Sequence, residues 1–582
     1  MKRFVQHVSV RCSSKIGHHA LPVLLLLLTY IFPLLLVPPT ARVPLSDDWI
    51  HQLVVKHLVE NGELWIPPAL AVTLILQAFW GALFTWPFGI SPIALRCSTV
   101  VASFGGAVAC YGIFCALGVN RRRALIGAVA IWLSPLTFVL SYTFMSDVPY
   151  VALISAATYY LVRATRDGGL RMLALGSLLA GLSFLIRQPG ALVPLSALTW
   201  LLCTRPRWFR TAPWASLAAL LGPCVLVVAG YYFSVARSSM LSTWQKGVMQ
   251  TTWEAGVQQV LDHSWRLIVV GLFYVGLFVS PIILGAPHAL SRSWRRARGG
   301  PRALAVASLV PLGLWTNWYA LEHGGRAFPF IPFGSIINPE GLGTLSDING
   351  QRSFLLANWH WAAIAMLCAL SVVAAFLLIA GYDRSVTAGT DRPLSLWCSP
   401  AGLVLALGLG QFAGIIPPAL RIPSLIAYDR YYLPLLPFAM GLVLWSLRGQ
   451  RFSLSTAAVA LVLFAIVDVL GVQDWLSFKQ AYWDTARQLV VEQSIPLRQV
   501  EGGIEWDGTH FYEYMLAHPE DRVSRRPGDP WWLDLFAPMI DPVYVVAASP
   551  EPPPGYGFLL RRPYYSWLRP VGDSWIYVWK RE

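Results

Sequence analysis

The chain has 582 residues, of which 56% are hydrophobic and only 13% are charged, and its mean hydropathy is +0.54. Ordinary soluble proteins carry about 25% charged residues, so this composition excludes a single soluble core and indicates a polytopic membrane protein. The net charge of +14 does not indicate nucleic-acid binding, because the basic residues fall in short clusters between apolar runs. That distribution is typical of membrane topology.

The first apolar run, 21–37, follows a basic amino-terminal segment and predicts an uncleaved membrane anchor. In the first outer loop, 39–91, apolar stretches alternate with charged residues and break at Gly62 and at Pro67-Pro68. We therefore expect short helices on the membrane interface there. With the first run, the later apolar runs predict about thirteen spans. The later runs are 92–117, 123–142, 148–164, 171–186, 188–203, 213–233, 266–287, 303–321, 359–381, 399–418, 431–447 and 453–471.

Basic clusters fall on alternate connections between these spans. If the amino terminus is cytoplasmic, the positive-inside rule is obeyed at every inner segment. These segments contain Arg121–Arg123, Arg163 with Arg166 and Arg171, Arg205 with Arg207 and Arg210, the cluster 292–302, Arg384 with Arg392, and Arg448 with Arg451. The sequence therefore predicts a multi-pass protein of the cell inner membrane, with the first outer loop and the carboxyl terminus extracytoplasmic.

The last part of the chain differs in composition from the rest. Residues 472–582 contain 15 acidic and 11 basic residues, close to a soluble average. Alternating stretches at Val543–Ala547 and Trp575–Trp579 predict strands, and 484–494 predicts a helix. We therefore expect two domains: a transmembrane bundle over 1–471 and a small extracytoplasmic α/β domain over 472–582.

Three carboxylates are expected on the outer face of the membrane. Asp47 and Asp48 follow the first span, and Asp147 lies at the outer end of the third. Adjacent carboxylates repel and tend to share a proton or a cation, which suits acid/base chemistry; the alternatives are a solvated helix end for the pair and a helix cap for Asp147. No thiolate or histidine metal motif is present, so no cofactor is assigned, and a divalent cation at these carboxylates remains open.

Two arginines lie on the same side, where the positive-inside rule does not place them. Arg187 is followed by Gln188-Pro189, and Arg430 stands in an aromatic segment, Tyr428 to Pro434. Each could hold a lipid phosphate through its fork of donors, or extend to the headgroups as an interfacial residue. In the tail, the segment 505–510 favours a turn, and its acids Glu505 and Asp507 are weaker candidates for binding an acceptor.

Four stretches together resemble the GT-C membrane glycosyltransferases, in particular glycosyltransferase family 39, the protein mannosyltransferase and aminoarabinose-transferase-like group. They are "SDDWIHQLVVKHLVENGELWIPP", "YTFMSDVPYVAL", "FLIRQPGAL" and "YDRYYLPLLPF", and their order covers residues 20–450. The resemblance implies an all-α GT-C-like bundle. The tail resembles that of an uncharacterised bacterial branch.

The resemblance also implies a reaction: transfer of a sugar from a polyprenyl-phosphate donor to a lipid, glycan or protein acceptor, with inversion. It makes Asp47 the catalytic base, Asp48 and Asp147 its supporting acids, and Arg187 and Arg430 ligands of the donor phosphate. One departure is Ile66 before Pro67-Pro68, where the aminoarabinose transferases have lysine. Two other classes remain open, a lipid or glycan transporter and a non-catalytic subunit of an envelope-assembly complex.

Overall fold

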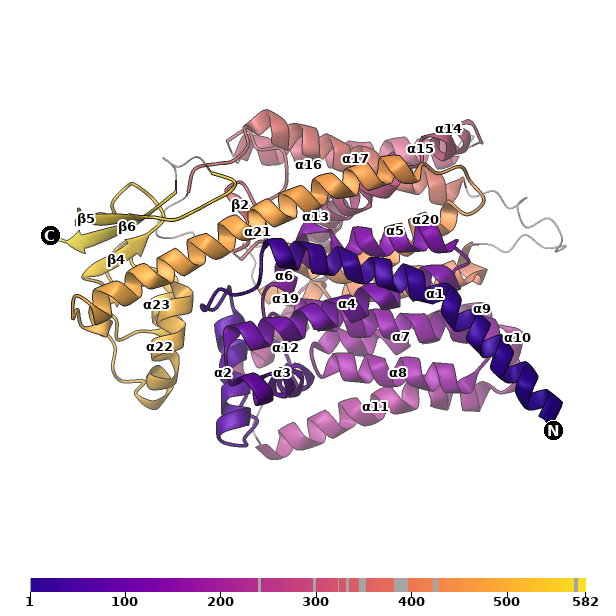
Figure 1. Ribbon diagram of the computed structural model, residues 1–582, viewed down its shortest axis with the longest axis horizontal. Coiled ribbons are helices and arrows are strands. Elements are labelled where there is room, and N and C mark those ends of the chain that lie inside the picture. The colour runs from indigo at the N-terminus through magenta and orange to yellow at the C-terminus, as the bar shows by residue number, and fades with distance from the viewer. Residues whose placement is uncertain are drawn as a thin grey trace.

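The computed structural model describes residues 2–238, 242–296, 300–322, 324–330, 334–344, 352–381, 396–421, 428–569 and 574–582. Long helices run roughly parallel in one bundle, and a small sheet lies beyond one end of it (Figure 1). The predicted fold class, a helical membrane bundle with a small carboxyl-terminal α/β region, is confirmed. The predicted cluster at 292–302 is described only in part, and Arg384 and Arg392 lie outside the described residues.

Within the described ranges, seven helices are long and apolar enough to cross a membrane. They include parts of α1 (Lys2–Leu36) and α11 (Pro213–Ser238), all of α4 (Pro92–Ala116), α13 (Val257–Leu284), α17 (Asn358–Ala380) and α21 (Leu454–Val491), and the segment Pro400–Arg421. That segment contains α18 (Pro400–Ala413) and α19 (Ile416–Arg421). The chain is thus a multi-pass membrane protein.

The other predicted spans correspond to helices that are shorter, broken or more charged. These are α7 (Asp147–Asp167), α8 (Leu170–Phe184), α9 (Leu192–Thr204), α15 (Gly300–Ala307), α16 (Leu309–Glu322), α20 (Leu436–Ser446) and the pair α5 (Arg121–Trp132) and α6 (Pro135–Ser141). The pair is bent by 62° and would give an eighth span. The count of thirteen therefore stays a prediction.

The bend between α5 and α6 has a local cause. A proline disfavours the helical conformation at the residue before it, so α5 ends ahead of Pro135. Ser134 is extended, and its hydroxyl accepts a hydrogen bond from the Thr137 amide, which caps α6. Pro135 occupies the first position of α6, where its missing amide proton costs nothing.

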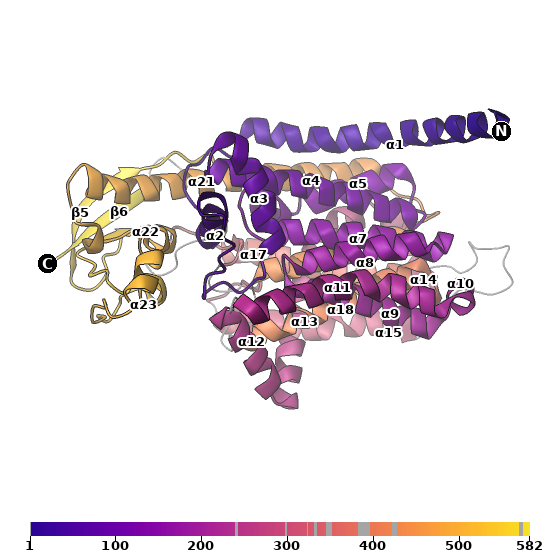
Figure 2. The same cartoon turned by 90° about the horizontal axis from the view of Figure 1, so that it is seen from below.

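The first outer loop contains two helices, as predicted. Helices α2 (Asp48–Glu60) and α3 (Ile75–Phe88) lie across one end of the bundle, transverse to its long helices (Figures 1 and 2). With 14 residues, α3 is too short for a span. A third short helix, α12 (Thr243–Glu254), is tied to this loop because Trp244 donates its backbone amide to the Pro68 carbonyl at 3.3 Å.

The basic segments gather at the opposite end. Short helices α10 (Arg207–Thr211) and α14 (Pro287–Arg296) lie there, as does the amino terminus (Figure 1). Arg123 donates to the Leu447 carbonyl at 2.6 Å, and Arg448 donates to the Leu117 carbonyl at 2.8 Å. Basic clusters from distant parts of the sequence therefore share one face of the molecule.

The carboxyl-terminal region lies at the same end as α2. Helix α21 is 38 residues long and continues without a break through the predicted boundary at residue 472. It leads to a four-stranded sheet of order β3-β4-β6-β5, parallel between β3 and β4 and otherwise antiparallel. The strands are β3 (Val500–Glu501), β4 (Tyr544–Ala547), β5 (Tyr556–Pro563) and β6 (Trp575–Arg581), and the helices are α22 (Ile504–Ala517) and α23 (Trp531–Phe536).

Most of the predicted tail elements are present. The two predicted strands correspond to β4 and β6, and the predicted helix is the end of α21. The turn predicted over 505–510 is wrong, because these residues form the first turns of α22. Acidic residues in a first helical turn complement the partial positive charge of the helix amino terminus, which explains why an acid-rich stretch is helical here.

One apolar cluster forms the core of the carboxyl-terminal region, and another attaches this region to α2. One face of the sheet buries Val546 and Val578 against Phe478 and Tyr482 of α21. A second cluster joins Trp49 of α2 to side chains of α22 and α23. Because one continuous helix and one apolar cluster link the regions, the division at residue 472 stays a prediction.

We predict that the carboxyl terminus and Asp47 lie on the extracytoplasmic side. The basis is the separation of the basic face from the end that carries α2 and the sheet. Alkaline phosphatase is active only outside the cytoplasm, so its fusion after residue 582 should be active, while a fusion after residue 296 should be inactive. The reverse pattern would invert the topology.

Candidate active site

Asp47 is the exposed member of the first-loop pair. It immediately precedes α2 and makes no side-chain capping bond. Its side chain is 47% exposed, and it forms an ion pair of 2.8 Å with Arg430, whose side chain is only 5% exposed. The structure thus presents one accessible carboxylate against one buried guanidinium.

Asp48 is fully buried and is surrounded by donors. It accepts hydrogen bonds from the Leu45 amide at 2.6 Å, the Phe144 amide at 3.2 Å and the Gln52 side chain at 3.0 Å. Burial raises its pKa to about 7, although Arg96 and the two backbone amides act in the opposite direction. Asp48 therefore fixes the loop before α2 onto the loop before α7.

Asp147 is the first residue of α7 and is buried. The N-cap position of α7 is Ser146, and the Asp147 side chain makes no hydrogen bond that could cap the helix. Neither carboxylate oxygen has a hydrogen bond, and its ionic contact is to Arg187 at 2.9 Å. Arg187 also donates from Nε to the Ser146 hydroxyl at 2.8 Å. The two sequence motifs therefore meet as a buried ion pair.

Arg430 belongs to the short helix η4 (Asp429–Leu435). It donates to the Gly334 carbonyl at 3.2 Å and lies over the Tyr428 ring at 4.4 Å. The carboxylate of the neighbouring Asp429 accepts the backbone amides of Arg430 at 2.7 Å and of Ile336 and Ile337, each at 2.8 Å. The Arg430 guanidinium forms its ion pair with Asp47 of the first outer loop and not with this sequence neighbour.

The two ion pairs adjoin each other. Arg187 lies over the ring of Tyr431 at 5.7 Å, and Tyr431 directly follows Arg430 in the chain. Asp47 and Asp147 both act electrostatically on Arg430. Four of the predicted site residues, Asp47, Asp147, Arg187 and Arg430, thus come together around one tyrosine.

His51 and Arg96 belong to the support of this site, and sequence reasoning missed both. His51 donates from Nδ1 to the Phe144 carbonyl at 3.1 Å, and burial lowers its pKa to about 4, so the ring is neutral. Arg96 donates to the Ala41 and Val43 carbonyls. A charged residue inside the apolar run 92–117 was the signal for Arg96, because such residues in spans carry specific roles.

The two weaker candidates in the tail are buried. Glu505 pairs with Lys479 at 2.6 Å and accepts the Ser46 amide at 3.1 Å. Asp507 accepts from the Trp532 indole at 2.9 Å and the Gly502 amide at 3.2 Å. Glu505 is therefore adjacent to the Asp47 loop, whereas these contacts of Asp507 lie within the carboxyl-terminal region.

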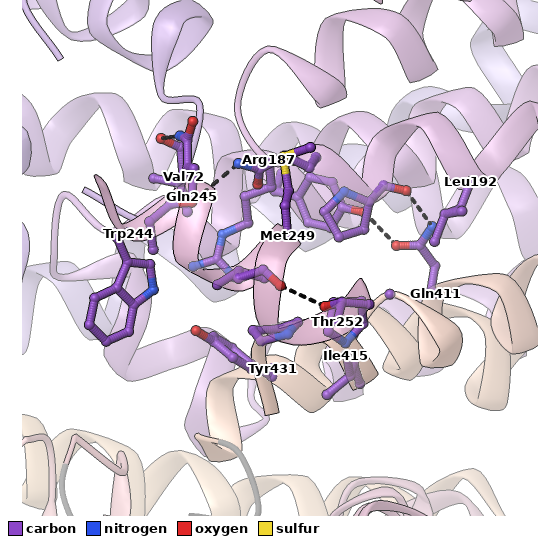
Figure 3. Close-up of a pocket in the computed structure, with 18 of the residues that line it drawn as sticks. Val72, Arg187, Leu192, Trp244, Gln245, Met249, Thr252, Gln411, Ile415 and Tyr431 are labelled. Atoms are coloured by element: carbon purple, nitrogen blue, oxygen red, sulfur yellow. Dashed lines mark hydrogen bonds between the residues drawn. The ribbon is translucent and has the colours of Figure 1, made fainter. Parts of the chain in front are cut away.

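A cavity of about 520 Å³ opens beside Arg187. Figure 3 shows Arg187 and Gln245 on one side of it and Tyr431 and Ile415 on the other. Apolar side chains form most of the remaining wall, among them Val72, Leu192, Trp244 and Met249. The cavity thus combines an apolar interior with a guanidinium at its edge.

The described residues contain no cluster of three or more histidine, cysteine, aspartate or glutamate side chains that could hold a metal ion. The carboxylates of the site instead face arginines or backbone amides. The divalent cation left open by the sequence therefore gains no ligand set among these residues.

Comparison with known proteins bears on this arrangement. Residues 74–232 match the dolichyl-phosphate-mannose-protein mannosyltransferase family. The predicted resemblance to glycosyltransferase family 39 is confirmed over this segment, which contains Asp147 and Arg187 and is less than half of the chain. Among curated proteins, none matches the sequence.

Two solved structures illustrate the likeness of the whole chain. ArnT from Cupriavidus metallidurans, bound to undecaprenyl phosphate, is 14% identical over 97% of this chain and 98% of its own, with a TM-score of 0.38. The oligosaccharyltransferase AglB from Archaeoglobus fulgidus, in complex with an inhibitory peptide and a dolichol-phosphate, is 13% identical over 82% of this chain and 59% of its own, with a TM-score of 0.39. Scores this low carry no argument about the site.

We predict a pH-dependent contribution of Asp48 to stability. Its pKa is about 7 in the folded chain and 3.8 ordinarily, so the folded state holds a proton that the unfolded state releases between these values. Stability from this group should therefore fall as pH rises from about 4 to about 7. Thermal unfolding of the purified protein at pH 5 and pH 8 should show a larger loss in wild type than in Asp48→Asn. Equal losses would contradict the assignment.

Proposed function

We propose that this protein is a membrane glycosyltransferase that moves a sugar from a polyprenyl-phosphate donor to an acceptor on the extracytoplasmic face of the inner membrane. The acceptor is a lipid, a glycan or a protein. The observation that carries the proposal is the apolar cavity with Arg187 at its edge, next to the exposed Asp47 and its partner Arg430. The family match over 74–232 supports the same class of reaction.

The cavity has the chemistry of a polyprenyl-phosphate site. Its apolar wall would accept isoprene units, and Arg187 would meet the phosphate at the edge. Guanidinium groups bind phosphate oxygens through two parallel hydrogen bonds, and they do so more strongly where water is excluded. Arg430, buried beside Tyr431, is the second candidate ligand.

The proposed reaction balances without a nucleotide or a metal. An acceptor hydroxyl loses its proton to Asp47 and attacks the anomeric carbon, while the bond from that carbon to the phosphate oxygen breaks. The electron pair leaves with polyprenyl phosphate, whose added charge Arg187 and Arg430 stabilise. Displacement from the opposite face inverts the configuration.

The Asp47–Arg430 contact gives donor binding a second role. In the structure the guanidinium is occupied by the carboxylate at 2.8 Å. A donor phosphate at Arg430 would compete for those donors and so release Asp47 to accept a proton. Asp48 and Asp147 act as supporting acids in this proposal, since both are buried and hold the loops that carry the site.

Two other functions compete with this one. A lipid or glycan transporter would also need an apolar cavity, and a non-catalytic subunit could keep the whole fold. Neither requires an exposed carboxylate paired with a buried arginine that precedes Tyr431 of the cavity wall. Substitution of Asp47 therefore discriminates among the three.

We predict that Asp47→Asn lowers glycosyl transfer by roughly two or more orders of magnitude, because asparagine keeps the volume but cannot accept the proton. Mass spectrometry of glycolipids and surface glycans would compare a deletion strain complemented with wild type, Asp47→Asn or the exposed control Asp262→Asn. The asparagine variant at 47 should accumulate a polyprenyl-phosphate sugar and lose one glycosylated product. If that variant restores the product as wild type does, the base assignment fails; an unchanged profile on deletion removes the enzyme assignment.

We further predict that Arg187→Lys weakens binding of polyprenyl phosphate about tenfold or more, because lysine keeps the charge but loses the planar fork. Native mass spectrometry of the purified protein with undecaprenyl phosphate would measure the bound fraction. Arg266→Lys, at an exposed arginine of α13, is the matched control. Full binding by both Arg187→Lys and Arg430→Lys would leave the two arginines as interfacial residues.

A further inference from the structure

Two networks connect the carboxyl-terminal region to the Asp47–Arg430 pair. The first reaches the backbone just before Asp47. Ser46 has φ +58°, a left-handed conformation that a serine seldom adopts without support. Its amide donates to Glu505 of α22 at 3.1 Å, and Lys479 of α21 donates to the same carboxylate oxygen at 2.6 Å. All three groups are buried.

Packing restricts the same loop. Gly508, one turn after Glu505 in α22, lies against the indole of Trp49, and an added Cβ would come within 2.7 Å of that ring. Trp49 follows the two aspartates in α2. The loop with Asp47 is thus held by an amide–carboxylate bond on one side and by a close helix contact on the other.

The second network reaches Arg430. Arg430 donates to Gly334, and its neighbour Asp429 accepts the Ile336 and Ile337 amides. Ile337 begins a small hairpin of β1 (Ile337–Asn338) and β2 (Gly341–Leu342). The backbone that contacts Arg430 therefore lies just before this hairpin, and Asp429 binds the amides where the hairpin begins.

That hairpin is anchored to α21 by a buried charge cluster. Asp474 of α21 pairs with Arg352 at 2.9 Å and with Arg569 of the tail at 3.3 Å. Arg569 also donates to the Glu340 carbonyl in the hairpin, and the Trp475 indole donates to the Thr344 carbonyl at 2.9 Å. One carboxylate with two buried arginines forms a network that fails if a member is removed, because the remaining charges stay buried.

We propose that α21 and the carboxyl-terminal region position the Asp47–Arg430 pair, with Glu505 as the positioning residue on the Asp47 side and Asp474 on the Arg430 side. Neither residue touches the substrate. Each acts on backbone next to the reacting pair, one through Ser46 and one through the hairpin. The catalytic consequence rests on the proposed function, whereas the positioning itself does not.

The positioning is tested without any activity assay. Hydrogen exchange measured by mass spectrometry on the purified chain reports on the peptide that contains Ser46. Glu505→Ala should accelerate its exchange about tenfold or more, and Glu505→Gln, which still offers an acceptor oxygen, should restore most of the protection. Glu501→Ala removes another buried carboxylate that contacts Gly503 of the same region and should leave the Ser46 peptide unchanged. Equal exchange in Glu505→Ala and wild type, or equal acceleration in Glu501→Ala, overturns the inference.

Glycosyl transfer measured in the same variants tests the catalytic consequence of the positioning. Glu505→Ala should lower kcat at least tenfold with little change in donor KM, Glu505→Gln should recover most of it, and Glu501→Ala should stay near wild type. Asp474→Asn should instead raise donor KM, because it loosens the Arg430 side. Normal kcat in a Glu505→Ala protein with accelerated exchange would remove the catalytic part of the inference. Absence of transfer in wild type would count against the proposed function alone, since the exchange result stands apart from it.

Discussion

The contact between Asp47 and Arg430 is the interaction on which the organisation of this molecule depends. One partner is about half exposed and the other is almost fully buried. A buried guanidinium without a counter-charge is costly, so the carboxylate stabilises the arginine even when no ligand is present. The same contact holds two segments together that are separated by nearly four hundred positions in the chain. One pair of side chains therefore both neutralises a buried charge and joins two distant segments of the chain.

The other charged groups around this pair differ from Asp47 in their exposure to solvent. Asp48 and Asp147 are buried and act on backbone or on another arginine, so their carboxylates are not free to meet a substrate directly. His51 is kept neutral by burial, and its ring is committed to a carbonyl. This difference assigns different tasks to three carboxylates that look equivalent in the sequence, because environment and not residue type sets what each can do.

Four of the candidate residues that the sequence singled out lie together in the structure, but the sequence did not show how they pair. Asp47, Asp147, Arg187 and Arg430 stand out because charges at the ends of apolar runs are uncommon and need a reason. Which acid meets which arginine depends on the packing of distant helices, and no local pattern encodes it. The charge of Arg96 inside an apolar run was a usable signal, but its partners, the Ala41 and Val43 carbonyls, lie in another segment of the chain. No pattern in the sequence indicated the Asp474 cluster, since its members lie in the segment before α17, in α21 and in the tail.

Helix α21 shows a second limit of prediction from sequence, and its length has a structural consequence. Hydropathy falls near residue 471 because the surroundings change, yet the backbone continues as one helix of 38 residues. At about 1.5 Å per residue it is about 57 Å long, and a hydrocarbon core takes up about 30 Å of that length. The remainder is a stiff rod that sets the height of the sheet above the bilayer. For the transfer reaction proposed above, this would confine acceptors to a layer about one small domain thick, which favours groups tethered close to the membrane surface.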